Sequence, residues 1–387
     1  MKYHVLHIAR WYPNLTDKQI GSFVKKHIEA ISLKNKSTLI YVQRDPLLQT
    51  AFKIEKQQQE NFISFILYFR KTNFSILNLI RYFFYHFKLL KIVIKEQGKP
   101  NLVHLHAMYG MSLITYLLSQ KLHVPFFITE HWNGFTNDKF SKKDFVFRWV
   151  TKYVSKKAKG ITAVSSFLQK GLKENNISES IVVIPNVVEK FEGAPKLKFD
   201  NTKINILTIA DLDDDVKNIS AIITALSNIK NETKNNFIYH IVGHGKDELK
   251  LKHLVAEYKM ERQIIFYGLK ENNEVLEFIA SCDFVVINSR VETFSVVLAE
   301  AFMSGKPAIV TACGGTQEIF RPENGIMISI DDNEGLQNAI ETMLFKYNDY
   351  NAETIMQTVG NKYQKDTISN QFQMLYDDAL LQSNPNK

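Results

Sequence analysis

Two glutamates, Glu292 and Glu300, are the residues of this chain whose type and spacing most clearly suggest chemistry. The pattern predicts that Glu292 lies in a loop and that Glu300 lies about two turns into the helix that follows. A helix N-terminus presents unpaired backbone N–H groups, which bind hydroxyl and phosphate oxygens. Apolar residues surround Glu300, so the helix is expected to be mostly buried and its carboxylate to need a polar partner. An anionic ligand with hydroxyl groups would fit, although two glutamates at this spacing also arise by chance, with Glu300 exposed.

The elements that must position these glutamates follow an alternating pattern of apolar runs and helical segments. Such alternation is typical of β–α–β units with a parallel sheet covered on both faces. The pattern runs through the first half of the chain, is interrupted between Asn186 and Asn201, and then starts again. The predicted strands are 3–9, 38–42, 102–107, 125–129, 161–164, 181–184, 204–210, 237–242, 264–266, 284–287 and 308–310. We therefore predict an α/β fold with two Rossmann-like domains that face each other across a deep cleft.

The segment from Asn288 to Glu318 resembles the donor-site signature of retaining glycosyltransferases of family 4, also called group 1, which have the GT-B fold. The motif Glu-x-Phe-Gly is matched by Glu292-Thr293-Phe294-Ser295, and Glu-Ala-Met by Glu300-Ala301-Phe302. Gly305-Lys306-Pro307, Gly314-Gly315 and Glu318 follow in the expected order. Ser295 replaces a glycine, which would narrow the space around the donor sugar.

The resemblance implies roles for further residues of the second half. Lys217 stands where the family has a lysine that contacts the donor diphosphate, but Asp211 replaces the arginine that normally assists it. Gly243 and Gly245 resemble the family's Gly-x-Gly before a helix. Glu292, Glu300 and the backbone of Phe294 and Ser295 are then expected to bind the donor, with Glu292 contacting sugar hydroxyls near the reaction. The acidic run Asp213–Asp215 is expected to be a solvated turn.

In the first half, the resemblance places Gly21 and Ser22 in a loop that covers the phosphates. His131 follows a strand and stands where the family often has a histidine that reaches the donor sugar. Glu292 and His131 are accordingly the predicted catalytic pair. His104 and His106 alternate on one strand face, but no third metal ligand is evident from the sequence, so we expect no metal ligands and no metal cofactor.

The interruption of the pattern between Asn186 and Asn201 indicates the domain boundaries, and the resemblance implies the role of each domain and the course of the last helix. Residues 1–190 are expected to form an acceptor-binding domain and residues 202–365 a nucleotide-sugar-binding domain. Residues 366–387 are expected to form a C-terminal helix that crosses back to the first domain.

Charge is distributed unevenly along the chain. Residues 1–200 contain 31 Lys and Arg against 14 Asp and Glu, whereas residues 201–387 contain 17 against 26. No nucleic-acid-binding module is recognisable, so the basic half is better explained by an anionic membrane or a lipid-diphosphate acceptor. Asn73–Gln97 predicts a helix with aromatic and basic residues, which is either an interfacial membrane helix or an aromatic-rich core helix.

The absence of a signal-peptide pattern and the two widely separated cysteines predict a cytoplasmic protein without disulfides. The basic first half adds the expectation of a peripheral location on the inner face of the cytoplasmic membrane. The predicted function is retaining transfer of a sugar from a UDP- or GDP-linked donor to a lipid-linked or saccharide acceptor, in capsule, O-antigen or exopolysaccharide biosynthesis. Two alternatives remain open. One is a nucleotide-sugar 2-epimerase of the same fold, and the other is a catalytically degenerate partner of an active glycosyltransferase.

Overall fold

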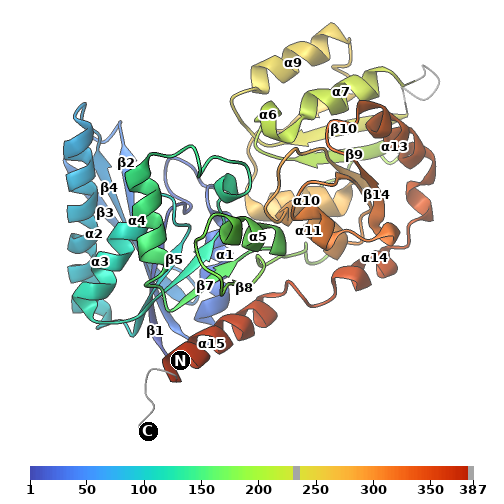
Figure 1. Ribbon diagram of the computed structural model, residues 1–387. Helices are drawn as coiled ribbons and strands as arrows, with labels where there is room; N and C mark the ends of the chain where they lie inside the picture. The colour runs from blue at the N-terminus through green and yellow to red at the C-terminus, as the bar shows by residue number, and fades with distance from the viewer. Residues whose placement is uncertain (230–235, 382–387) are drawn as a thin grey trace. The chain divides into compact units, whose positions relative to one another are not determined.

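The computed structural model describes residues 1–229 and 236–381, which form two compact units (Figure 1). The first unit comprises Met1–Val187 together with Gln364–Lys387, and the second comprises Val188–Tyr363. Each unit is built around its own sheet. Each unit therefore has the α/β architecture that the alternating sequence pattern predicts.

The first unit contains an eight-stranded sheet with the order β3-β4-β2-β1-β5-β6-β7-β8. All neighbouring strands are parallel except β3 and β4. The central strand β1 is buried along its whole length, as expected for a strand with helices on both faces. The strands are β1 His4–Ala9, β2 Lys36–Asp45, β3 Phe52–Gln58, β4 Phe62–Arg70, β5 Leu102–His106, β6 Phe126–Glu130, β7 Gly160–Ala163 and β8 Val182–Val183.

Helices connect these strands, and the last helix of the chain joins them. Two of the helices begin at polar caps: Asp144 accepts from the backbone N–H of Phe147, and Ser165 accepts from that of Leu168. The helices of the first unit are α1 Ser22–Ser32, α2 Ser75–Gln97, α3 Ser112–Leu122, the 3-10 turn η1 Asn133–Phe135, α4 Phe145–Ser155, α5 Ser166–Glu174 and α15 Lys365–Leu381.

The hairpin formed by β3 and β4 is absent from the sequence prediction. β4 is a buried apolar run that pairs in parallel with β2, whereas β3 is largely polar and forms the antiparallel edge. A polar edge strand is a common way to prevent further strand pairing. The hairpin extends the sheet beyond the simple alternation of strand and helix.

The second unit contains a fully parallel six-stranded sheet with the order β11-β10-β9-β12-β13-β14. Its strands are β9 Ile204–Ile209, β10 Phe237–Val242, β11 Ile264–Phe266, β12 Phe284–Ile287, β13 Ala308–Thr311 and β14 Gly325–Ile328. Its helices are α6 Asp214–Lys217, α7 Ile219–Ser227, α9 Glu248–Glu257, α10 Asn272–Ser281, α11 Val296–Met303, α12 Thr316–Ile319, η2 Pro322–Asn324, α13 Asn333–Lys346, η3 Tyr347–Asp349 and α14 Ala352–Val359.

Helix α15 belongs to the first unit although it follows the second in sequence (Figure 1). Ile368, Phe372 and Tyr376 of α15 are fully buried in a cluster with β1 and with the C-terminal part of α1. Ion pairs at its ends add to this packing, with Lys2 bound to Asp377 and Lys365 bound to Glu29. Residues 382–387 of the predicted helix lie outside the described residues.

Among the described residues, no helix is both long enough and apolar enough to span a bilayer. The helix predicted over Asn73–Gln97 is present as α2, and it lies along β2 and β4 (Figure 1). Cys282 and Cys313 are both free and buried.

Candidate active site

Backbone hydrogen bonds join the loops at the carboxyl ends of the strands in the second unit. The loop after β9 is bound to the loop after β10 through Leu212 N–H and the carbonyl of His244, at 3.0 Å. The loop after β12 is bound to the turn after β13 through Gly315 N–H and the carbonyl of Glu292, also at 3.0 Å. The carboxyl ends of parallel strands are where such folds bind ligands. These bonds hold the predicted donor-binding loops together.

Gly243 and Gly245 make the contact between two of these loops possible. A Cβ atom on Gly243 would lie 1.8 Å from the carbonyl oxygen of Ala210, and Gly243 has a φ of 138°. A Cβ atom on Gly245 would lie 2.6 Å from backbone atoms of Leu212. Both residues are therefore required as glycine by packing alone.

Lys217 and Glu292 meet in the second unit although they are 75 residues apart in sequence. Lys217 Nζ lies 2.5 Å from Glu292 Oε1, and Ser289 Oγ donates to the same oxygen at 2.8 Å. Both partners are partly buried, with side-chain exposures of 21% and 14%. The ion pair is therefore partly accessible to solvent.

The charge around Lys217 is more negative than the family signature implies. Burial lowers the pKa of Lys217, but Glu292 and then Asp211 raise it, and the net shift is upward. Lys217 is therefore a firmly charged cation. Because Asp211 lies close enough to act on it, this position adds a negative charge where the signature has an arginine.

Glu300 is buried in helix α11, with a residue exposure of 3%. The helix begins at Val296, so Glu300 lies about one turn from its start, and the expectation of two turns is wrong. The difference arises because Ser295 adopts a left-handed conformation with φ 65°, which keeps Thr293 and Phe294 out of the helix. Phe294 is buried and packs edge-on against Tyr363, with ring centroids 5.3 Å apart.

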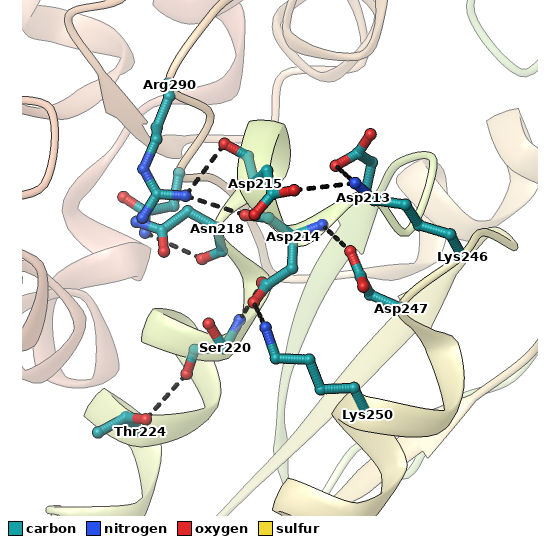
Figure 2. Close-up of polar contacts among 11 residues, drawn as sticks. Asp213, Asp214, Asp215, Asn218, Ser220, Thr224, Lys246, Asp247, Lys250 and Arg290 are labelled. Atoms are coloured by element: carbon teal, nitrogen blue, oxygen red, sulfur yellow. Dashed lines mark hydrogen bonds and ion pairs between the residues drawn. The ribbon is translucent and has the colours of Figure 1, made fainter.

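The acidic run Asp213–Asp215 is more structural than a solvated turn (Figure 2). Asp214 is buried and accepts from the backbone N–H of Ser220 at 2.8 Å and from Lys250 at 3.0 Å. Lys246 bridges Asp213 and Asp215. These carboxylates are paired with lysines, so they hold helix α6, which carries Lys217, in place.

Arg290 binds backbone carbonyl groups of α6, as Figure 2 shows. Its Nη1 donates to the carbonyls of Asp214 and Asp215, and its Nε pairs with Asp331 at 2.6 Å. Its backbone N–H also donates to the carbonyl of Val216 at 2.8 Å. Arg290 therefore positions the helix of Lys217 and does not stand in for the arginine that Asp211 replaces.

In the first unit, Gly21 caps helix α1 and Ser22 is its first residue. Gly21 has a φ of 69°, and a Cβ atom there would lie 2.4 Å from the carbonyl group of Trp11. Ser22 is half-buried. The loop that the resemblance assigns to phosphate binding is thus packed closely against the segment after β1.

His131 lies directly after β6 and is 7% exposed. Its ring packs against Phe23 at 4.8 Å and His27 at 5.2 Å, between centroids. Burial, and then His27, lower the pKa of His131 well below the usual value, so the ring is neutral at pH 7. Neither ring nitrogen has a hydrogen-bond partner among the described residues.

Glu130 fixes the backbone on which His131 sits. Its Oε1 accepts from the N–H groups of His131 and Trp132, both at 2.8 Å, and its Oε2 accepts from that of Met108 at 2.9 Å. Burial raises the pKa of Glu130 to about 7, although these three donors oppose the shift. Glu130 therefore joins the loops that follow β5 and β6.

Sequence reasoning missed Glu130, Ser289 and Arg290 as parts of these sites. Glu130 is adjacent to His131, and its acidic side chain at the end of an apolar strand was a usable signal. The contacts of Ser289 and Arg290 depend on how loops distant in sequence meet, and no local pattern indicates them. All the predicted donor-binding residues except Gly21 and Ser22 lie in the second unit.

Two family models match the chain in succession. Residues 46–190 match "Glycosyltransferase Family 4", and residues 189–355 match "Glycosyl transferases group 1". An uncharacterized glycosyltransferase of Methanocaldococcus jannaschii is 27% identical over 73% of this chain and 74% of its own length. An uncharacterized protein encoded in the cps region of Klebsiella pneumoniae is 23% identical over 83% of this chain and 90% of its own length.

Solved structures share the fold over nearly the whole chain. Sucrose-phosphate synthase from Thermosynechococcus elongatus has a TM-score of 0.79 at 16% identity and covers 98% of this chain and 100% of its own. The Anabaena protein HepE in complex with UDP-glucose has a TM-score of 0.71 at 16% identity over 97% and 100%. The GT-B glycosyltransferase fold therefore extends over both units.

Proposed function

Because the chain belongs to the glycosyltransferases that combine a family 4 and a group 1 segment, we propose that it transfers one sugar from a nucleotide-sugar donor to a lipid-linked or saccharide acceptor. The observation that carries the proposal is the Lys217–Glu292 pair among the strand ends of the second unit. It offers a cation for a diphosphate beside a carboxylate for sugar hydroxyls. The Anabaena protein of the same fold binds UDP-glucose, which supports a nucleotide-sugar donor.

We propose that transfer retains the configuration at the anomeric carbon. The bond from that carbon to the phosphate oxygen breaks, and the bond to the acceptor oxygen forms on the same face. The proton of the acceptor hydroxyl passes to the departing diphosphate. Lys217 and the N-terminus of α11 offset the negative charge that develops on the diphosphate, so the transfer itself needs no metal ion.

The exposed surface of the first unit favours a lipid-linked acceptor. Helix α2 exposes Ile76, Ile80 and Phe84 by 60% or more, and α4 exposes Phe145, Val146 and Trp149 by more than half. Helix α3 links them, since Tyr82 of α2 contacts Met111 at the start of α3, and Tyr116 of α3 contacts Tyr153 of α4. Basic side chains lie on the same helices and their flanks: Arg81, Lys88, Lys91, Lys142, Lys152, Lys156 and Lys157.

A surface that combines apolar and basic side chains in this way suits the interface of an anionic bilayer. We therefore propose that the protein works at the inner face of the cytoplasmic membrane, on a surface polysaccharide such as capsule or lipopolysaccharide. Support for the pathway comes from the relative in the Klebsiella pneumoniae cps region and from a lipopolysaccharide core biosynthesis glycosyltransferase of Rhizobium meliloti, which is 30% identical over 27% of this chain.

The proposal is tested by thermal shift with UDP- and GDP-sugars, alongside Lys217→Ala and Glu300→Ala variants. Stabilisation by one nucleotide class, lost in both variants, identifies the base and the donor site. The anomeric configuration of the product is then read by NMR. An inverted product would exclude retention, and interconversion of nucleotide sugars without an acceptor would indicate an epimerase. Failure of every donor to bind would favour a degenerate partner, with Asp211 as its first explanation.

A further inference from the structure

The first unit contains a group of buried histidines from three separate elements. His27 lies on α1, His106 is the last residue of β5, and His131 follows β6. Their exposures are 0%, 0% and 7%. One ring nitrogen of each lies within 4.8 Å of the others. Three imidazoles converging from different parts of the fold are typical of a metal site.

The hydrogen bonding of His27 leaves one of its two ring nitrogens without a partner. Its Nε2 lies 2.9 Å from the carbonyl oxygen of Pro185, which can only accept, so Nε2 carries the hydrogen. A neutral imidazole carries one hydrogen, so in that form Nδ1 is a bare lone pair, and it has no partner among the described residues. Histidines that bind metals commonly donate their other N–H to a backbone carbonyl in this way.

His106 is oriented by a similar set of contacts. Its Nε2 lies 3.2 Å from His7 Nδ1, and His7 Nε2 lies 3.2 Å from Ser37 Oγ. When His7 Nε2 donates to Ser37 Oγ, and His106 Nε2 donates to His7 Nδ1, the Nδ1 atom of His106 carries no hydrogen. This atom then offers a second lone pair. This atom and both nitrogens of His131 also have no partner among the described residues. The group thus holds four unpartnered ring nitrogens, which is costly in a buried environment unless a ligand satisfies them.

We propose that His27, His106 and His131 bind a divalent transition-metal ion of the zinc type. Neutral imidazole nitrogens suit zinc, and three of them leave a fourth position open. Nitrogens bound to one zinc ion at about 2.0–2.1 Å lie roughly 3.3 Å from each other, so any pair that is separated by as much as the 4.8 Å limit must move closer when the ion binds. The carboxyl group of Glu130, which accepts from the backbone N–H of His131, would offset part of the added charge when it is ionised.

A bound metal has a consequence for His131. One of its nitrogens would coordinate the ion, and the other would stay available at the side of the ring that faces away from it. The ion would thus fix the ring of the residue proposed to reach the donor sugar. This role concerns positioning, and it leaves the transfer chemistry proposed above free of metal.

A second trio shares His106 and competes for this assignment. His7, His104 and His106 also lie within 4.8 Å of one another. In that trio both nitrogens of His104 are already bonded, to Tyr376 and to Thr129, and both nitrogens of His7 are bonded as well. Binding there would break existing bonds, so the trio with His27 is favoured.

The test uses full-length protein without a histidine tag, freed of metal with a chelator. Zn²⁺ is titrated in competition with a chromophoric chelator, and Co²⁺ binding is followed by its visible absorption. We expect one ion per chain, with at least a hundredfold loss of affinity in His27→Gln and in His106→Gln. His86→Gln is the matched control, since His86 is equally buried but lies on α2 outside both trios.

Absence of binding by the folded wild-type protein at millimolar Zn²⁺ would overturn the proposal, as would binding that survives His27→Gln. Far-UV circular dichroism shows whether each variant folds. If both variants fail to fold, the wild-type protein still decides the question, because one Co²⁺ ion per chain should give the intense visible absorption of a four-coordinate site. The weak absorption of an octahedral Co²⁺ ion would count against the site. None of these readouts depends on sugar transfer, so they are independent of the proposed activity.

Discussion

Lys217 Nζ and Glu292 Oε1 lie 2.5 Å apart, so the cation expected to meet the diphosphate is already paired with the carboxylate expected to meet the sugar. The pair holds the lysine in place before a donor arrives. Binding of a diphosphate must then share or replace the contact with Glu292. Lys217 should therefore act mainly on binding of the diphosphate half of a nucleotide sugar, and Glu292 mainly on contacts with the sugar half.

Replacing Glu292 with Gln should separate these two functions. Without the carboxylate, Lys217 is less neutralised, so the nucleoside diphosphate alone should bind at least as tightly as to the wild type. Sugar transfer should fall about tenfold or more, because a charged hydrogen bond to the sugar is lost. Calorimetry with the nucleoside diphosphate and a steady-state transfer assay measure the two effects. A large loss of diphosphate affinity would contradict the assigned roles.

The left-handed conformation of Ser295 should make glycine the better residue at this position. A residue with a Cβ atom pays about 1 kcal/mol to adopt φ 65°, although glycine loses more backbone entropy on folding. Ser295→Gly should therefore be at least as stable as the wild type, and Ser295→Val markedly less stable. Amide hydrogen exchange in α11 reports this locally. Loss of protection in the glycine variant would show that the serine hydroxyl has a structural role.

Glu130→Gln should destabilise the first unit by about 2 kcal/mol, because the amide group replaces one acceptor oxygen with a donor and leaves a buried N–H unpaired. The chain offers a convenient probe, since Trp11, Trp132 and Trp149 are its three tryptophans and all lie in the first unit. Urea unfolding followed by tryptophan fluorescence measures the change. Glu174→Gln, an exposed change on α5, is the control. Equal stability of the two variants would refute the structural role of Glu130.

The first unit should lose stability in mild acid, and His86 should account for part of the loss. Burial lowers the pKa of His86 from 6.5 to about 4. Between pH 6.5 and pH 4, His86 is therefore protonated to a greater extent in the unfolded chain than in the folded one. The contribution of the neutral ring to the free energy of unfolding is complete above pH 6.5 and declines as the pH falls toward 4. At pH 5 the loss is about 2 kcal/mol.

His86→Gln should reduce the difference in unfolding free energy between pH 7.5 and pH 5 by that amount. His123→Asn, at an exposed position with a left-handed backbone, is the control. Tryptophan fluorescence again measures the unfolding of the first unit. An unchanged pH dependence in His86→Gln would mean that the ring is hydrated and not buried as described.

The exposed surface of α2 and α4 should bind anionic vesicles. The double variant Ile76→Ser, Trp149→Ser should bind phosphatidylglycerol vesicles at least tenfold more weakly than the wild type, because two large apolar side chains no longer enter the interface. Leu249→Ser, Phe345→Ser is the matched control, since both side chains are more than 70% exposed but lie in the second unit. Co-sedimentation measures the binding. Equal loss in both double variants, or equal binding to neutral phosphatidylcholine, would contradict the proposal.

Much of the fold could be predicted from the sequence because most strands are apolar runs separated by helical patterns. β11 and β12 have the predicted bounds, and α2 lies within the predicted helix. The β3–β4 hairpin was missed because a polar edge strand such as Phe52–Gln58 lacks a buried face, and an apolar run such as Phe62–Arg70 has no distinctive period.

The candidate site was predictable only in part, since its motif is local but its contacts are not. The sequence indicates Lys217 and Glu292 separately, whereas their ion pair depends on how the ends of β9 and β12 lie in the sheet. The approach of His27 to His106 and His131 likewise joins α1 to two strands. No single segment contains that information.

Helix α15 makes the second unit an insertion within the first. The chain leaves the first unit after Val187 and returns to it at Gln364, and the backbone N–H of Val188 donates to the carbonyl of Tyr363 at 3.0 Å, which joins the two ends of the insertion. During synthesis, the second unit is therefore complete before the first can bury Ile368, Phe372 and Tyr376. Part of the core of the first unit therefore stays uncovered until α15 has been synthesised.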